Sequence, residues 1–205
     1  VMGRRADVRR RVLSEDPPRV VIATVRSLLQ VVPPQSDFLD LHVGAEIDRD
    51  QFVRWLVARG YRREPQVEHR GEVAVRGDIV DVWLSHFNEP VRIELFGDEI
   101  ERLTHFDVST QRSLTTLISC SVYPAREWCP SEEDREAANA ALEQWPALRE
   151  VFQPLVDGQF VDGMESWLGW LQPDAPTFLD IIEPNRELVF VDRHRLAQRA
   201  TELLN

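Results

Sequence analysis

The sequence predicts an α/β fold in which a layered domain is interrupted by a small α+β domain with an antiparallel sheet. Two apolar, β-branched runs, residues 19–25 (RVVIATV) and 187–192 (ELVFVD), are typical of buried strands in a layered domain. Between them, four alternating runs separated by turn residues indicate an antiparallel meander. We therefore expect residues 1–45 and 119–205 to form the layered domain and residues 46–118 to form the inserted domain.

The first segment is expected to begin with a basic helix at residues 3–14. The apolar run at residues 19–25 follows, and then a short helix that ends before Pro33. Because this α/β pattern starts abruptly, we expect the layered domain to be truncated at its start.

The inserted domain opens with a strong helix signal at residues 46–61 (EIDRDQFVRWLVARGY). Asp48 is placed to cap the helix, and Gln51 occupies the capping-box position three residues later. Phe52 belongs to an apolar stripe, and Gly60 suits the position just after the helix end.

Four strands are then expected at hairpin spacing, with the helix packed on one face of their sheet. They are residues 72–77, 78–84, 91–97 and 99–108. Side chains alternate between the two faces of a strand. The inward set is therefore Val73, Val75, Val91, Ile93 and Leu95, and the outward set is Glu72, Ala74, Arg76, Arg92, Glu94 and Phe96.

The third segment resumes the α/β pattern. Ser131, followed by acidic residues, indicates the start of a helix, because side-chain oxygens cap a helix N-terminus and acids stabilise its first turn. Residues 187–192 are expected to form the buried strand, and residues 193–204 (RHRLAQRATELL) a closing helix.

The charged residues exclude several functions. All 24 positive residues are arginine, and a chain without lysine has neither the phosphate-binding lysine of a P-loop nor the amine of a Schiff-base enzyme. The net charge of −11 opposes DNA binding by general phosphate attraction and favours a protein partner. The absence of a long apolar run and of a signal peptide predicts a cytoplasmic protein with no membrane partner.

No catalytic, cofactor or metal site is predicted. The five histidines lack metal-ligand spacing, and Cys120 and Cys129 lack a CxxC pattern, so we interpret both as reduced thiols. His105 and Asp107 have no nucleophile motif nearby, which favours an ordinary strand surface. Binding of nucleic acid by the basic N-terminal helix remains an alternative, although that helix lacks interleaved aromatic residues.

Phe96 is the anomaly, because the alternation puts this aromatic side chain on the charged face of its strand. Arginine and aromatic residues are enriched at the centres of protein interfaces, so Arg76, Arg92 and Phe96 could form a partner-binding surface. Alternatively, Phe96 is covered by an edge loop or by the helix.

Two long stretches, RGEVAVRGDIVDVW and EPVRIELFGDEIERLTHFDVSTQRSL, closely resemble the module shared by the excision-repair protein UvrB and the transcription-repair coupling factor Mfd. In that family the module recruits UvrA. The continuation through FDVSTQRSL, YPAREW and GMESWLGWLQP looks like the coupling factors, and a fragment of UvrB is the alternative.

The resemblance implies a degenerate, helicase-like (RecA-like) α/β domain split around a UvrA-interaction domain at residues 46–118. It implies a non-catalytic module for transcription-coupled nucleotide excision repair, with ATP hydrolysis, double-stranded DNA translocation and RNA polymerase binding assigned to other domains. The residues that contact UvrA in the family fall on Arg76, Arg92 and Phe96. Leu95 departs from members that have an aromatic residue there, which affects only the packing behind the surface.

Overall fold

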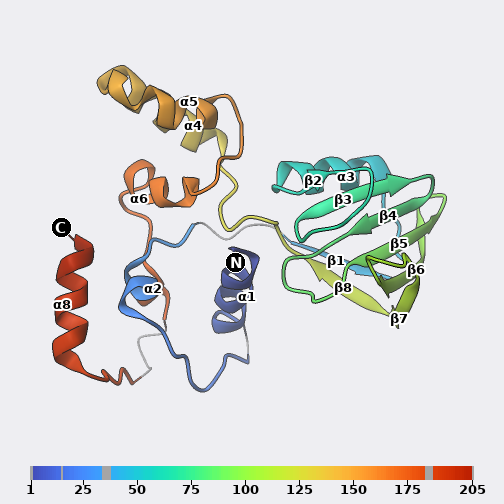
Figure 1. Ribbon diagram of the computed structural model, residues 1–205, viewed down its shortest axis with the longest axis horizontal. Helices are drawn as coiled ribbons and strands as arrows, with labels where there is room; N and C mark the ends of the chain where they lie inside the picture. Colours follow the sequence, from blue (N-terminus) through green and yellow to red (C-terminus); the bar gives the residue numbers. More distant parts are fainter. Residues whose placement is uncertain (1, 15, 34–37, 183–186, 205) are drawn as a thin grey trace. The chain divides into compact units, whose positions relative to one another are not determined.

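A computed structural model describes residues 2–14, 16–33, 38–182 and 187–204 (Figure 1). The chain is a mixed α/β protein that divides into two compact units. The first, which we call the sheet unit, comprises residues 1–8 and 35–129, and the second, the helical unit, comprises residues 9–34 and 130–205. Helix α1 (Met2–Val12) confirms the predicted basic helix.

Helix α3 (Arg49–Ala58) forms as predicted. The Asp48 side chain accepts a hydrogen bond from the backbone N–H of Gln51 at 2.6 Å, which satisfies one of the free donors at the helix start. Gly60 follows the helix end with φ +86°, a conformation that favours glycine. A Cβ atom at Gly60 would also lie 2.9 Å from Cγ of Arg126, so both backbone conformation and space require glycine.

A six-stranded sheet follows α3, with the strand order β2-β3-β4-β5-β6-β7. Its strands are β2 (Arg62–Arg63), β3 (Glu72–Arg76), β4 (Ile79–Val82), β5 (Val91–Phe96), β6 (Glu99–Phe106) and β7 (Ser113–Leu117). The four predicted strands are β3 to β6, and they pair antiparallel in sequence order, which confirms the meander. The edge strands β2 and β7 were not predicted; β2 pairs parallel with β3, and β7 antiparallel with β6.

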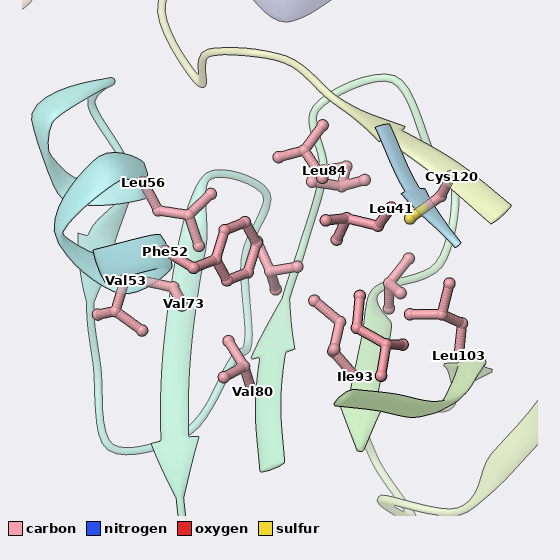
Figure 2. Close-up of a cluster of buried hydrophobic side chains, with 14 of the residues drawn as sticks. Leu41, Phe52, Val53, Leu56, Val73, Val80, Leu84, Ile93, Leu103 and Cys120 are labelled. Atoms are coloured by element: carbon pink, nitrogen blue, oxygen red, sulfur yellow. The ribbon is translucent and has the colours of Figure 1, made fainter. Parts of the chain in front are cut away.

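Two further strands belong to the sheet unit. They are β1 (Leu39–His42) and β8 (Ser119–Val122), which pair antiparallel with each other. Leu41 of β1 and Cys120 of β8 join the buried core of the sheet unit (Figure 2). The sheet unit thus extends further at both ends than the inserted domain predicted at residues 46–118.

The main core fills the space between α3 and one face of the sheet. Phe52 and Leu56 of α3 are buried with Val80 and Ile93 of the central strands (Figure 2). Fully burying an aliphatic or phenylalanine side chain stabilises a fold by roughly 1.5–3 kcal/mol. Burial also raises the pKa of the Cys120 thiol to about 12, so this cysteine is a protonated core residue and not a reactive one.

The face of the sheet opposite α3, which we call the outward face, is only partly open to solvent. Its predicted residues Glu72 and Ala74 are buried, so their expected exposure is wrong. Ala74 packs with Val67, Phe106 and the partly buried Trp83 in a second apolar cluster. The chain before β3 is tied to this end of the face, because the backbone N–H groups of residues 68 and 69 donate to the Glu72 carboxylate at 2.8 Å.

The helical unit is built from short helices. Besides residues 9–12 of α1, it contains α2 (Val25–Leu29), α4 (Glu132–Gln144), η1 (Pro146–Leu148), α5 (Arg149–Val156), η2 (Met164–Trp167), α6 (Leu168–Leu171), α7 (Phe178–Ile181) and α8 (Arg193–Leu204). The predicted helix after Ser131 is α4, which begins with a capping box formed by Ser131 and Asp134. The predicted closing helix is α8. Phe152 of α5 and Trp167 of η2 pack edge to face, with ring centroids 5.6 Å apart.

The two strands predicted for the layered domain are wrong. Residues 19–24 and the described residues 187–192 lie outside any strand, with Ile22 94% exposed and Val191 79% exposed. An apolar, β-branched run favours extended backbone, but a strand also needs a hydrogen-bonded neighbour. The described residues of the helical unit contain no strand and therefore do not show the expected RecA-like sheet. Among the described helices, none is long and apolar enough to span a bilayer.

Candidate partner-binding site

Strand β5 ends in a tight turn, and that turn places Phe96 in solvent. Gly97 has φ +63° in the turn to β6, and Phe96 pairs with Glu99 across the hairpin. The Phe96 side chain is 77% exposed, so neither α3 nor a loop covers it. The backbone N–H of Leu95 donates to the carbonyl of Asp78 at 2.9 Å, which holds the β3–β4 turn beside this end of β5.

A buried carboxylate lies on the outward face in the middle of the sheet. The strand register places Asp81 of β4 opposite Arg92 of β5. Arg92 donates through Nε to Asp81 Oδ1 at 2.7 Å and through Nη2 to Oδ2 at 2.9 Å, and Arg76 Nη2 donates to the same Oδ2 at 2.6 Å. The Asp81 side chain is 2% exposed, so two arginines neutralise a carboxylate that water cannot solvate.

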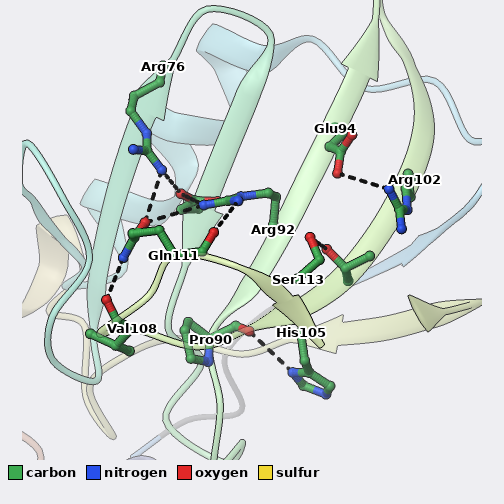
Figure 3. Close-up of polar contacts among 11 residues, drawn as sticks. Arg76, Pro90, Arg92, Glu94, Arg102, His105, Val108, Gln111 and Ser113 are labelled. Atoms are coloured by element: carbon green, nitrogen blue, oxygen red, sulfur yellow. Dashed lines mark hydrogen bonds and ion pairs between the residues drawn. The ribbon is translucent and has the colours of Figure 1, made fainter. Parts of the chain in front are cut away.

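The loop between β6 and β7 brings Gln111 to the same two arginines (Figure 3). Its Oε1 accepts from Nη2 of Arg76 at 3.2 Å and from Nη2 of Arg92 at 3.4 Å, and its backbone carbonyl accepts from Arg92 Nη1 at 3.1 Å. Its Nε2 donates to the Val108 carbonyl at 2.8 Å, and its backbone has φ +59°, which is uncommon outside glycine. We call Arg76, Asp81, Arg92 and Gln111 the arginine network.

Asp107 organises this loop. Its Oδ1 accepts hydrogen bonds from the Ser109 hydroxyl, the Thr110 hydroxyl and the Thr110 backbone N–H at 2.6–2.8 Å. These donors favour the ionised form and lower the pKa of Asp107 to about 2. His105 Nδ1 lies 3.2 Å from the Pro90 carbonyl instead, so the contacts of His105 and Asp107 are those of a strand and a turn.

The two arginines of the network have different surroundings. Arg92 is 12% exposed, its three nitrogens all donate within the protein, and its guanidinium lies over the Phe106 ring at 4.5 Å. The hydrogen bond to Asp81 raises the pKa of Arg92. Arg76 is 45% exposed and donates to described residues only through Nη2, which leaves Nε and Nη1 for solvent or a partner.

The predicted site residues therefore share one face but not one environment. Phe96 and Arg76 are exposed, as expected for a partner surface, whereas Arg92 is an internal ion-pair residue. Glu94 lies on the same face of β5 and forms an ion pair of 3.9 Å with Arg102 of β6 (Figure 3). We call Arg76, Glu94, Phe96 and Arg102 the open end of the outward face.

Asp81 and Gln111 were missed from sequence. Asp81 carried a signal, because it is a charged residue inside the apolar run IVDVW and faces outward in the alternation. Gln111 carried none, because its position depends on the backbone of a loop. Among the described residues, no group of three or more histidine, cysteine or acidic side chains could hold a metal ion.

The outward face combines an exposed aromatic residue with a half-exposed arginine, and these are residue types enriched in protein-interaction surfaces. Residues 39–128 match the family model described as the UvrB interaction domain. The chain is 34% identical to the transcription-repair-coupling factor of Bacillus subtilis over 98% of its own length and 19% of that protein. It is 34% identical to that of Mycobacterium tuberculosis over 90% of its length and 35% identical to that of Myxococcus xanthus over 78%, in each case covering 16% of the relative.

Residues 39–128 are therefore similar to a UvrB interaction domain, and the chain is similar in sequence to part of the transcription-repair-coupling factors. It spans less than a fifth of the length of these curated relatives, 16% to 19%.

Proposed function

We propose that this chain is a UvrA-recruiting module of a transcription-repair coupling factor, acting in transcription-coupled nucleotide excision repair. The observation that carries the proposal is Phe96, an aromatic residue that is 77% exposed on the outward face of β5, the strand that also carries Arg92 of the arginine network. Its exposure has no role in the core of the sheet unit, because Val91, Ile93 and Leu95 on the other face of β5 supply that packing.

Each residue of the open end has a chemical role in binding UvrA. Phe96 enters an apolar pocket and loses its exposed surface to the partner. Arg76 donates from Nε and Nη1 to an acidic side chain or carbonyl of UvrA, since Nη2 is already used within the chain. Glu94 and Arg102 supply a charged rim of both signs beside Phe96.

The parent protein, in this proposal, is an ATP-dependent DNA translocase that displaces a stalled RNA polymerase and delivers UvrA to the lesion. Its other domains bind RNA polymerase and double-stranded DNA and hydrolyse ATP, and the present chain contributes recruitment. The relatives described above are transcription-repair-coupling factors, which supports this assignment over the alternative of a UvrB fragment.

Direct DNA binding is the competing function. The 35 acidic residues outnumber the 24 arginines, and several arginines of the sheet unit pair with acids, including Arg62 with Glu72 at 3.0 Å. Phosphate binding depends on released counterions and therefore on a basic surface. A DNA complex with submicromolar affinity at roughly 150 mM salt would favour this competitor.

The deciding experiment is calorimetric titration of the 205-residue chain with purified UvrA, repeated with Arg76→Ala. We expect saturable binding that Arg76→Ala weakens. Arg54→Ala is the matched control, because Arg54 is an exposed arginine on α3, on the other side of the sheet. Absence of a UvrA complex with the wild-type chain, or equal weakening by the two variants, would overturn the proposal.

A further inference from the structure

A single nitrogen of Arg76 donates hydrogen bonds to two acceptors, and these bonds hold the side chain. The Nη2 amino group carries two hydrogens, and it donates to Asp81 Oδ2 at 2.6 Å and to Gln111 Oε1 at 3.2 Å. Because a guanidinium is planar, fixing two directions at one nitrogen also fixes the directions of Nε and Nη1. Those two groups are the ones that have no acceptor among the described residues.

Both acceptors are themselves fixed. The two-point ion pair with Arg92 fixes the orientation of the buried Asp81 carboxylate. The left-handed backbone of Gln111 and its bond to Val108 orient the amide, and the Asp107 turn holds the loop. Arg92 also bonds the Gln111 carbonyl, so it connects the two supports.

We infer that Asp81 and Gln111 are positioning residues of the UvrA site and that Arg92 acts through them, so that Arg76 meets an anionic group of the partner in a preset orientation. This inference rests on the proposed function. A long arginine side chain otherwise loses conformational freedom when it binds, and presetting its orientation removes a cost that corresponds to about two- to tenfold in affinity.

The test compares variants of the full chain in UvrA titrations. Asp81→Asn keeps the shape of the side chain but removes its charge, and we expect a loss of about tenfold in UvrA affinity. Gln111→Gly removes the amide while glycine accepts the φ of +59°, and we expect a loss of about threefold. Gln111→Glu keeps an acceptor for Arg76 but loses the Nε2 donor to Val108, so its UvrA affinity should lie between those of Gln111→Gly and the wild type.

A general loss of stability is controlled by Glu72→Gln. Glu72 is another buried carboxylate of the outward face, paired with Arg62 and with two backbone N–H groups. This variant, like Asp81→Asn, should lower the melting temperature, but it should leave UvrA affinity unchanged at temperatures where the chain is folded.

A spectroscopic readout is independent of UvrA. In the ¹⁵N-labelled chain, fixed bonds to Arg76 Nη2 should slow rotation about the Cζ–N bonds and give separate Nη resonances. Asp81→Asn and Gln111→Gly should speed this rotation and merge the Arg76 Nη resonances into one averaged signal. Glu72→Gln should leave the resonances separate. Averaged Arg76 resonances in the wild type would overturn the positioning role.

The two proposals fail differently. If Arg76→Ala and Phe96→Ala bind UvrA like the wild type, the proposed function is wrong and the positioning role for UvrA falls with it. If those two variants weaken binding while Asp81→Asn and Gln111→Gly bind like the wild type, only the positioning role is overturned. Equal weakening by Glu72→Gln would also overturn it.

Discussion

The two ends of the outward face differ although they belong to the same strands. At the covered end, Ala74 and Phe106 are buried with Val67 in a compact apolar cluster. At the open end, the strands β3 and β5 finish in the half-exposed Arg76 and the exposed Phe96. Between them lies Asp81, buried and bonded to both arginines. One sheet face therefore changes from core to surface within a few residues of each strand.

This difference separates residues that hold the fold from residues that are available to a partner. Arg92 belongs to the first group, because it stacks on Phe106 and neutralises Asp81. Arg76 and Phe96 belong to the second group. Truncation at the two ends should consequently affect different measurements, the free energy of unfolding at one end and UvrA affinity at the other.

The largest loss of stability is expected at the covered end. Phe106 is fully buried, and Phe106→Ala would leave a cavity between Val67 and Ala74 and remove the ring beneath Arg92. We expect the free energy of unfolding to fall by about 3–5 kcal/mol, measured by urea denaturation. A change below about 1 kcal/mol would mean that the covered end is not part of the core.

Arg92→Ala should have the next largest effect. It leaves the buried Asp81 carboxylate with only the single bond from Arg76, and breaking a buried ion pair typically costs about 3 kcal/mol. The expectation from sequence that Arg92 lies on a solvent-facing surface implied almost no loss of stability. Urea denaturation of Arg92→Ala, compared with Arg54→Ala, distinguishes an internal Arg92 from a solvent-facing one. Equal free energies of unfolding for the two variants would support the solvent-facing assignment.

Arg76→Ala should destabilise the chain less. Arg76 is 45% exposed, so solvent already screens its ion pair, and Asp81 keeps its two bonds from Arg92. A pair of this kind contributes up to about 1 kcal/mol. If thermal unfolding shows that Arg76→Ala is as unstable as Arg92→Ala, the division between the two arginines is wrong.

Local signals predicted the middle of the sheet unit well. Helix α3 formed where Asp48 and Gly60 bracket an apolar stripe, and the strands β3 to β6 formed where alternation is interrupted by hairpin turns. In the helix and in the hairpins, the backbone hydrogen-bond partners are close together in the sequence, so a short sequence pattern is enough to predict them.

Long-range features were not predicted, for a physical reason. The apolar runs at residues 19–25 and 187–192 favour extended backbone but specify no neighbouring strand. The site shows the same limit. Alternation identified the face of Phe96 and Arg92, but it could not show that the register sets Asp81 opposite Arg92 or that a loop brings Gln111 to it.

The smallest effect concerns the loop that supports the network. The pKa of Asp107 is about 2, below its ordinary value of 3.8, so its bonds stabilise the turn fully above about pH 4. That contribution declines as the pH falls from about 4 through about 2. A ¹³C titration of the Asp107 carboxyl should give a pKa near 2; a value near 3.8 would show that the Ser109 and Thr110 donors do not hold the loop in solution.

The measurement that tests the central claim most directly is the UvrA affinity of Phe96→Ala, taken together with its stability. Val57→Ala is the control, because Val57 is an exposed apolar residue of α3, on the other side of the sheet. We predict that Phe96→Ala changes the free energy of unfolding by no more than about 0.5 kcal/mol. Its UvrA affinity should fall about thirtyfold, a binding loss of about 2 kcal/mol, while Val57→Ala binds like the wild type. Wild-type UvrA affinity in Phe96→Ala would contradict the account.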